Sequence, residues 1–313
     1  MANFAYAVPY MPPEIVYPAW SGMVMKWVGW DGSEWTISDL SQGVVLLSGV
    51  RGLNMPPTKR HTSTSPGLHG SRRRGWITDE REVFWPVKVF NDGGSDEWLA
   101  HERAFWRTMH PDKPGAWSVT QPSGETRTLT CVYDNDGGQE FDVIPSLTGW
   151  MNYGIYLAAE QPFWAGETIS GAWAASAPVD FFGGASKGPA FNISSGSTFA
   201  QASLTNPGDV ETWPVYTIVG PCTAANVGGV SVPFAIPAGK AVRIDTAPGP
   251  LSQTALYGDW VGGQVVNTVD RTRDLGTINF APVPAGGEKP LSISMTGAGQ
   301  IIAEITPLYF RAW

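Results

Sequence analysis

Residues that could bind a metal ion are scattered along this chain rather than grouped. The run Asp134–Gly138 begins like a calcium loop, whose oxygen ligands recur at fixed positions, but Gln139 and Pro145 stand where that loop needs glycine and glutamate. The four histidines include no pair spaced four residues apart, and neither of the two cysteines has a Cys or His near it in the sequence. We therefore expect no metal site, and a solvated hairpin turn at Asp134–Gly138.

Motifs for phosphate binding and nucleophilic catalysis are also missing from the sequence. The run Gly183–Gly188 lacks the spacing of a phosphate-binding loop, Gly297–Gly299 lacks the third glycine of a dinucleotide loop, and Gly-x-Ser-x-Gly does not occur. A glycosidase needs only two carboxylates that the fold brings together, but none of the 28 acidic residues has a distinctive context. We predict that the protein is not an enzyme and has no cofactor.

Two tryptophans and one arginine cluster are candidates for binding. Trp213 and Trp260 could stack on sugar rings, although a place in a core or a subunit interface is the more common role of large aromatic side chains. The cluster Arg72, Arg73 and Arg74 lies in a turn-rich stretch, where it could meet phosphate, an acidic neighbour or solvent alone.

Composition narrows the class of protein. The 313 residues carry 20 basic and 28 acidic side chains, a net charge of −8, which is the wrong sign for a protein that binds nucleic acid through its phosphates. The first twenty residues carry four prolines and no Lys or Arg, unlike a secretory signal, and the longest apolar runs are too short for a membrane span. We expect a soluble protein that is synthesised in the cytoplasm.

The number of charged residues differs between the two halves of the chain, which indicates two domains. Residues 1–165 hold 13 basic and 18 acidic residues, whereas residues 166–313 hold 7 and 10, and a small, uncharged, turn-rich stretch lies between them. We predict an N-terminal domain over residues 1–168, a linker over 169–178 and a C-terminal domain over 179–313.

The first domain reads as a β-sandwich-like unit with one helix. Two β-favouring runs flank Asp31-Gly32 in the pattern of a hairpin, and residues 76–90 read as one long strand in which Pro86 marks an edge or a bulge. Ser95 is placed to cap a helix in which Trp98, Phe105 and others recur at helical spacing. Residues 56–75 look like a turn-rich loop.

The second domain shows short apolar runs every ten to fifteen residues. Glycine- and proline-rich breaks separate them, which is typical of an antiparallel β-sandwich. The runs lie at residues 191–193, 202–204, 215–219, 230–236, 241–244, 265–266, 291–295 and 301–305. The fold class is therefore all-β, or mainly β with one helix.

Several longer motifs resemble one known family, the distal tail proteins of long-tailed (siphovirus-type) phages, in the form found in phages of actinobacteria. The most specific is Gly154-Ile-Tyr-Leu-Ala-Ala-Glu-Gln-Pro-Phe-Trp164. The segment Pro284–Pro290 departs from the tight turn that relatives tend to have there. The other motifs are Trp30–Trp35, Gly43–Pro57, Pro66–Gly70, Arg81–Val87, Gly124–Tyr133, Leu204–Pro221 and Leu308–Trp313.

The resemblance implies an N-terminal belt domain, a galectin-like C-terminal sandwich and an architectural role. Six copies would form a ring that joins the major tail tube protein to the tail-tip hub protein, in the virion tail tip. The tape measure protein and then DNA would pass through it, and receptor-binding or other minor tail proteins would be further partners.

Contacts within such a ring can be assigned to three regions of the first domain. We expect them at the hairpin around Asp31 and Gly32, at the loop that contains Arg72, Arg73 and Arg74, and at the helix near Trp98. The alternative function is a host glycan-binding adhesin that uses Trp213 and Trp260 of the C-terminal sandwich.

Overall fold

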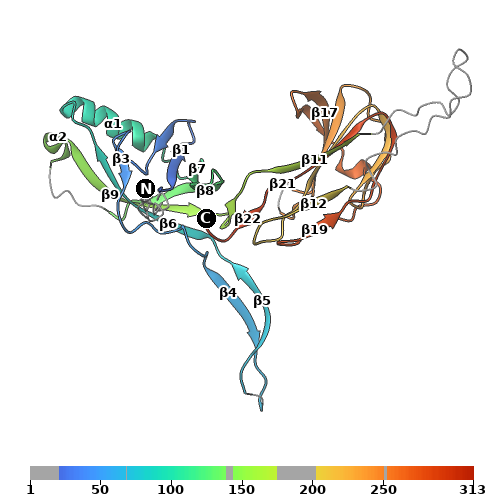
Figure 1. Ribbon diagram of the computed structural model, residues 1–313, viewed down its shortest axis with the longest axis horizontal. Helices are drawn as coiled ribbons and strands as arrows, with labels where there is room; N and C mark the ends of the chain where they lie inside the picture. Colours follow the sequence, from blue (N-terminus) through green and yellow to red (C-terminus); the bar gives the residue numbers. More distant parts are fainter. Residues whose placement is uncertain (1–20, 68, 139–143, 175–201, 250–251) are drawn as a thin grey trace, which may run out of the picture.

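The computed structural model describes residues 21–67, 69–138, 144–174, 202–249 and 252–313. The chain is mainly β, as predicted, and its strands gather in two lobes, with a long hairpin that extends away from both (Figure 1). The first lobe runs from β1 to β10 and the second from β11 to β21. The expected strand at residues 191–193 lies outside the described residues.

The first lobe is built on a strongly curved antiparallel sheet in the order β2-β1-β7-β8-β9-β6-β3. Its two edges approach each other, because the Leu46 amide of β3 donates to the carbonyl of Ile37, next to β2. The bounds are β1 Val24–Val28, β2 Glu34–Thr36, β3 Val44–Leu46, β6 Arg81–Phe90, β7 Gly115–Thr120, β8 Thr126–Asn135, β9 Trp150–Ala159 and β10 Trp164–Ala165.

Tryptophans fill the interior of this sheet. Trp27, Trp85, Trp117 and Trp164 are all buried, and successive ring centroids lie 5.2, 5.1 and 5.0 Å apart in edge-to-face or tilted contacts. In β6, Val83, Trp85, Val87 and Val89 alternate inward, because successive side chains of a strand point to opposite faces. The predicted period-two face of this strand is confirmed.

The predicted strand over residues 76–90 is two strands instead. β5 ends at Thr78 and β6 begins at Arg81, and residues 79–80 between them belong to neither strand. Pro86 lies inside β6 next to the end of β3, where its carbonyl accepts from the Leu47 amide. Strand β3 ends at Leu46, opposite Val87, so Pro86 lies just beyond the end of that strand, where its missing N–H is tolerated, rather than at a bulge or on an edge strand.

Helix α1 spans Ser95–Arg107 and places Trp98 and Phe105 against the sheet. Its N-cap residue is Gly94, not Ser95 as predicted: Gly94 has a φ of 102°, and the Ser95 hydroxyl donates to the carbonyl of Ser146 instead. That carbonyl belongs to α2 (Pro145–Thr148), a single turn that the sequence analysis did not predict.

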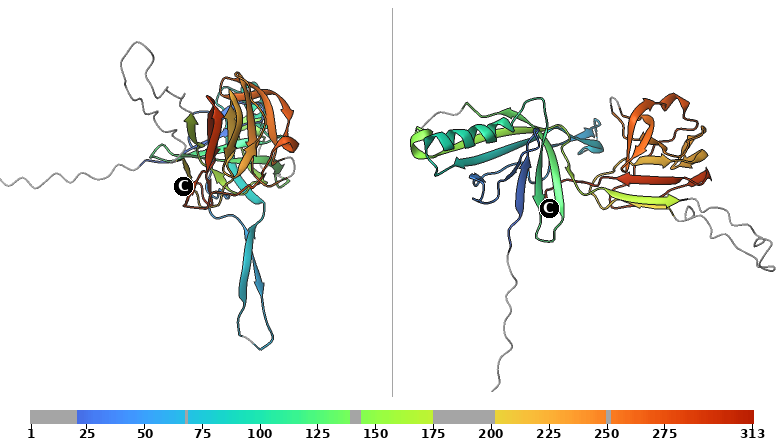
Figure 2. Two further views of the ribbon diagram at one scale, coloured as in Figure 1. Left: turned by 90° about the vertical axis from the view of Figure 1, so that its right-hand side faces the viewer. Right: turned by 90° about the horizontal axis from the view of Figure 1, so that it is seen from above.

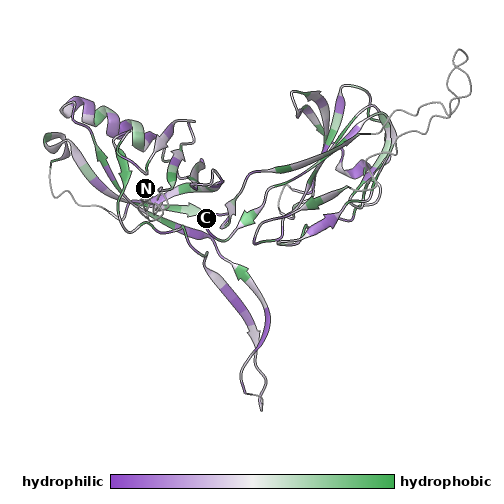
Figure 3. Ribbon diagram, in the orientation of Figure 1, coloured by the Kyte–Doolittle hydropathy of each residue, from purple (hydrophilic) through white to green (hydrophobic). Residues whose placement is uncertain are grey.

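The predicted turn-rich loop at residues 56–75 is largely a β-hairpin. β4 (Thr58–Ser63) pairs with β5 (Arg72–Thr78), and both strands are mostly exposed. We call residues 58–78 the arm. It extends away from the lobes in perpendicular views, and most of it is hydrophilic (Figures 2 and 3).

The second lobe is a sandwich of antiparallel sheets around an aliphatic core. The main sheet has the order β11-β21-β13-β16-β17-β18 and faces the sheet β15-β14-β20, with the pair β12-β19 beside them. The bounds are β11 Ile169–Ala174, β12 Ser203–Thr205, β13 Val215–Val219, β14 Cys222–Val227, β15 Val230–Val232, β16 Lys240–Asp245, β17 Ala255–Val261, β18 Gln264–Asp270, η2 Thr272–Asp274, β19 Glu288–Pro290, β20 Ile293–Gly297 and β21 Gln300–Ile305.

Two segments connect the lobes. The first six residues of the expected linker 169–178 form β11, which pairs along its whole length with β21; residues 175–178 lie outside the described residues. The chain then returns, because β22 (Leu308–Tyr309) pairs with β10 and Ala312 is buried in the core of the first lobe. The last six residues therefore pack with the first lobe, although they follow the second in sequence.

Candidate assembly interface

Arg72, Arg73 and Arg74 lie on β5 of the arm, and all three side chains are exposed. Arg72 and Arg73 are opposite Ser63 and Thr62, and a register shift next to His61 leaves Arg74 at a bulge, where its Nε donates to the Ser63 hydroxyl over 3.0 Å. The pairing therefore displays the three arginines along one strand rather than on a loop.

The arm is basic, whereas the lobe that carries it is acidic. The arm includes Lys59, Arg60 and the three arginines but no Asp or Glu. The remainder of residues 1–165 holds eight basic and eighteen acidic residues. A two-stranded hairpin has no core of its own and is at best marginally stable alone in water, so the arm depends on its attachment to the first lobe or on a contact with another surface.

Asp31 and Gly32 form the tip of the β1–β2 hairpin, as predicted. Asp31 Oδ1 accepts from the Ser33 amide and hydroxyl, at 3.1 and 2.6 Å, and the hydroxyl contact lowers the pKa of this carboxyl. Gly32 has a φ of 81°, a conformation that favours glycine. Beside them Trp30 is partly exposed and lies under the Lys113 ammonium, 3.8 Å from its ring centroid. This turn is ordered and accessible.

Trp98, the third predicted ring contact, is inside the lobe. Its side chain is only 3% exposed, since helix α1 turns this face toward the sheet. A contact at this helix would need the exposed side chains around Trp98, such as Asp96 and Arg103, rather than the indole itself.

Arg81 fixes the root of the arm. It is 2% exposed, and its guanidinium donates to four backbone carbonyls: those of Pro162 at 2.6 Å, Gly52 at 2.6 Å, Phe310 at 2.7 Å, and Asn54. Burial lowers the pKa of Arg81 to about 10, so it stays charged at neutral pH. It thereby joins three segments that are far apart in the sequence at the point where the arm begins.

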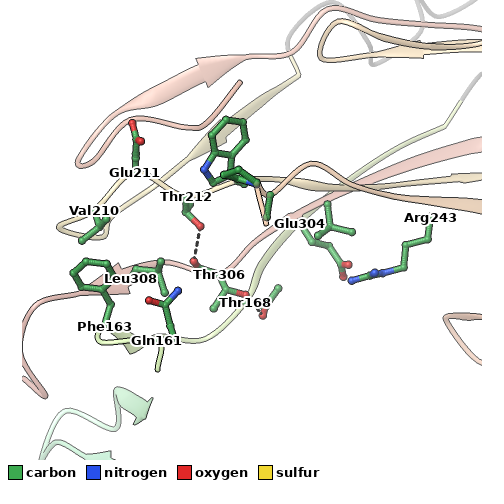
Figure 4. Close-up of a pocket in the computed structure, with 14 residues that line it drawn as sticks. Gln161, Phe163, Thr168, Val210, Glu211, Thr212, Arg243, Glu304, Thr306 and Leu308 are labelled. Carbon is green, nitrogen blue, oxygen red and sulfur yellow. Dashed lines mark hydrogen bonds between the residues drawn. The ribbon is translucent and has the colours of Figure 1, made fainter. Parts of the chain in front are cut away.

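Trp213 and Trp260 do not form one binding platform. Trp213 precedes β13, at the end of the main sheet where Val215 faces Asp245. Trp260 lies at the opposite end, where its amide donates to Gly239 over 2.9 Å. Trp213 is one of the residues that line a cavity of about 530 Å³. Phe163 and Gln161 of the first lobe and Arg243 and Glu304 of the second line the same cavity (Figure 4).

The described residues contain no group of three or more His, Cys, Asp and Glu side chains placed to hold a metal ion. Both cysteines are free and buried, and burial raises the pKa of the Cys131 and Cys222 thiols. In the part of the chain that the structure describes, no helix has the length and apolar character needed to cross a membrane.

The sequence matches no family model and no curated protein, but solved structures match it in fold. The crystal structure of SPP1 Dit (gp 19.1), described as a paradigm of the hub adsorption apparatus in phages that infect Gram-positive bacteria, aligns with a TM-score of 0.52 over 92% of this chain and 99% of that chain, at 14% identity. This chain has a Dit-like fold. Structures of the phage P2 baseplate in its activated conformation, with Ca and with Sr, match with a TM-score of 0.52 over 91% of this chain and 98% of theirs, at 10% identity.

The Dit-like fold spans both lobes, because more than nine-tenths of the chain aligns. Sequence reasoning missed two features of this chain, the arm and the buried Arg81. The arm strands are polar on both faces and lack the apolar alternation that signals a strand, and Arg81 was not distinguished from the other arginines. The one signal that included Arg81 was the motif Arg81–Val87, which was noted only for its resemblance to the family.

Proposed function

We propose that this chain is a structural subunit of a phage tail tip, and that six copies close into a ring around a channel. The observation that carries the proposal is the Dit-like fold, which extends over nearly the full length of the matched chains from phage adsorption assemblies. The function is architectural, and we propose no catalytic step.

The ring would join the major tail tube protein to the tail-tip hub protein, with the tape measure protein and DNA in transit through it. Receptor-binding or other minor tail proteins would attach outside, after synthesis of the chain in the host cytoplasm. The net charge of −8 supports a conduit for DNA, because a chain that is acidic overall repels phosphates rather than retaining them.

The arm is the principal ring contact in this proposal. A cyclic ring uses two different faces of each subunit, and the basic arm and the acidic remainder of the first domain form such a pair. The Asp31-Gly32 turn and the exposed face of helix α1 around Trp98 are the further contacts, on the acidic side.

The experiment is the mass of the purified chain by light scattering after size exclusion, with negative-stain imaging of the main peak. We expect a hollow six-fold ring. The triple variant Arg72→Glu, Arg73→Glu, Arg74→Glu should give a folded monomer, because it reverses the charge of the arm and leaves every buried contact in place.

The matched control is the triple variant with lysine at the same three positions, which keeps the charge and should retain the ring. The wild-type ring should weaken as salt rises from about 0.1 to 1 M, since exposed charges are screened over that range. A ring that persists in the glutamate variant would remove the arm from the interface. A chain that stays monomeric with its folded partners present would remove the ring itself.

A further inference from the structure

One cavity of about 530 Å³ takes its walls from both lobes. Figure 4 shows Gln161 and Phe163 of the first lobe toward one end of this cavity, and Arg243 and Glu304 of the second lobe toward the other. Trp213 also lines it. Its volume lies within the range of about 300–1,000 Å³ that is usual for small-molecule sites. We call it the junction cavity.

Two charged residues of the junction cavity lie on one face of the main sheet. Strand β13 runs between β16 and β21, and its residues Val215 and Thr217 point to the same face because they are two positions apart. Glu304 of β21 is opposite Val215, and Arg243 of β16 is opposite Thr217. The sheet therefore presents a carboxylate and a guanidinium side by side, one on each side of β13.

The aromatic wall of the cavity is held in place by the residues next to Trp213. Thr212 is buried and exchanges two backbone hydrogen bonds with Val283, of 3.1 and 2.7 Å. On the other side, the carbonyl of Pro214 accepts from the Thr246 hydroxyl over 2.6 Å. The Trp213 side chain itself is partly accessible. A fixed backbone thus presents this indole ring to the cavity.

The wall from the first lobe is held in a similar way. Pro162, which lies between Gln161 and Phe163, is buried, and its carbonyl accepts from the Arg81 guanidinium over 2.6 Å. Both walls are therefore in place before a ligand arrives, and little conformational freedom is lost when one binds.

Four polar side chains of the junction cavity are available to a ligand. Within the part of the chain that the structure describes, none of these side chains takes part in a hydrogen bond or an ion pair. They supply acceptors from two carboxylates, donors from a guanidinium, and both from an amide. The four residues are Gln161, Glu211, Arg243 and Glu304.

This mixture of donors and acceptors matches hydroxyl groups. A hydroxyl group donates and accepts at once, whereas an anion needs donors alone and a cation needs acceptors alone. A sugar ring carries several hydroxyl groups around its edge and an apolar C–H face, and that face packs on an aromatic ring such as the Trp213 indole. Two carboxylates outnumber the one guanidinium, so the wall repels phosphate-bearing polymers. The ligand that fits is therefore a neutral sugar.

We propose that the junction cavity binds a neutral saccharide unit of a polysaccharide chain. Trp213 stacks on the C–H face of the sugar ring, Glu304 and Arg243 bind its hydroxyl groups from the second lobe, and Gln161 binds from the first lobe. The bound sugar contacts both lobes at once. Trp260 takes no part, because it lies at the opposite end of the main sheet. This inference does not depend on the ring.

The test is saturation-transfer NMR of the full-length protein with neutral trisaccharides of glucose, galactose, mannose, rhamnose and N-acetylglucosamine. We expect at least one of them to bind, with the strongest transfer to the ring protons of its C–H face, which lie against the indole. A titration of that sugar then gives its Kd. Absence of binding by all of the trisaccharides would overturn the proposal.

Variants of the cavity wall locate the binding site. Trp213→Leu removes the stacking ring and should raise the Kd about tenfold or more. Gln161→Ala and Arg243→Met each remove one exposed hydrogen-bonding group and should raise it about threefold to tenfold. The matched control is Trp260→Leu, an aromatic replacement in the same sheet that should leave the Kd unchanged.

Circular dichroism shows which of these variants fold. If Trp213→Leu does not fold, the two exposed positions decide, because neither side chain holds a contact within the described chain. An unchanged Kd in both Gln161→Ala and Arg243→Met would overturn the proposal. So would a loss of binding in Trp260→Leu alone, since the sugar would then bind at the other end of the sheet.

Two charged competitors test the chemistry of the cavity, and one variant separates it from the ring. Inorganic phosphate and trilysine should not displace the sugar, and displacement by either would assign the cavity to an ion and overturn the proposal. The titration is repeated in the triple glutamate variant of the arm, where we expect the same Kd. Failure of the ring therefore leaves this test intact, and failure of this test leaves the ring intact.

Discussion

The two lobes have interiors of different kinds. The first is packed around four tryptophans in mutual edge contact, together with a buried arginine whose guanidinium is bonded to backbone carbonyls. The second is packed by Val, Ile, Leu and Ala, with Tyr216 as its largest fully buried side chain. Large planar rings can pack together in few ways, whereas small aliphatic side chains can repack readily. The core of the first lobe therefore allows fewer alternative packings than that of the second. The first lobe also carries the arm.

The largest effect should come from a tryptophan in the centre of the first core. Trp85→Ala removes the ring that contacts both Trp27 and Trp117 and leaves a large cavity, so we expect a loss of about 3–5 kcal/mol in the free energy of unfolding. Ile218→Val in the second core should cost about 0.5–1.5 kcal/mol. Urea unfolding followed by circular dichroism measures both, and a cost for Trp85→Ala no larger than that for Ile218→Val would contradict the prediction.

The buried arginine should give the next largest effect. Arg81→Met keeps much of the side-chain volume but removes a donor from four carbonyls, of which that of Gly52 still accepts from the Trp164 indole N–H, and we expect a cost of about 3 kcal/mol. Arg51→Met, at an exposed pair with Glu82, is the control and should cost under about 0.5 kcal/mol. Equal midpoints for the two variants in thermal unfolding would show that the carbonyl contacts of Arg81 contribute nothing net.

Removing the hydroxyl of one tyrosine in each lobe should give the smallest changes in the free energy of unfolding. Tyr153 donates to Glu102 over 3.1 Å in the first lobe, so Tyr153→Phe should destabilise by about 1 kcal/mol. The Tyr216 hydroxyl is buried without a hydrogen-bond partner, so Tyr216→Phe should be neutral or slightly stabilising. A loss on Tyr216→Phe as large as that on Tyr153→Phe would indicate a partner for this hydroxyl, such as a buried water.

Helices and strands whose apolar residues recur at regular spacing could be predicted from the sequence. Contacts between segments that are distant in the sequence could not. The face of β6 and the turn at Asp31-Gly32 follow from local patterns, and the structure confirms both. The arm was read as a loop because a strand without a buried face has no hydrophobic period. The helix was predicted from its apolar spacing, but that same spacing buries Trp98, so the residue that signals the helix is not available as a contact.

The binding candidates show the same limit. Trp213 and Trp260 are both partly accessible and belong to the same domain. They lie at opposite ends of a sheet, and their local sequences do not predict this. The rings of Trp76 and Phe310 are in edge contact although they are 234 residues apart in the chain, and they meet only because β22 returns to β10. Tertiary topology alone creates that contact.

The return of the last residues to the first lobe gives the two lobes a pair of covalent links. One runs from β10 to β11 and the other from β21 to β22, and the two are tied by the Thr168–Thr306 hydroxyl contact of 3.0 Å. A single tether lets two bodies swivel about any axis, whereas two tethers side by side leave a hinge with one preferred axis and resist twisting. A torque applied to the second lobe therefore passes directly to the sheet that roots the arm.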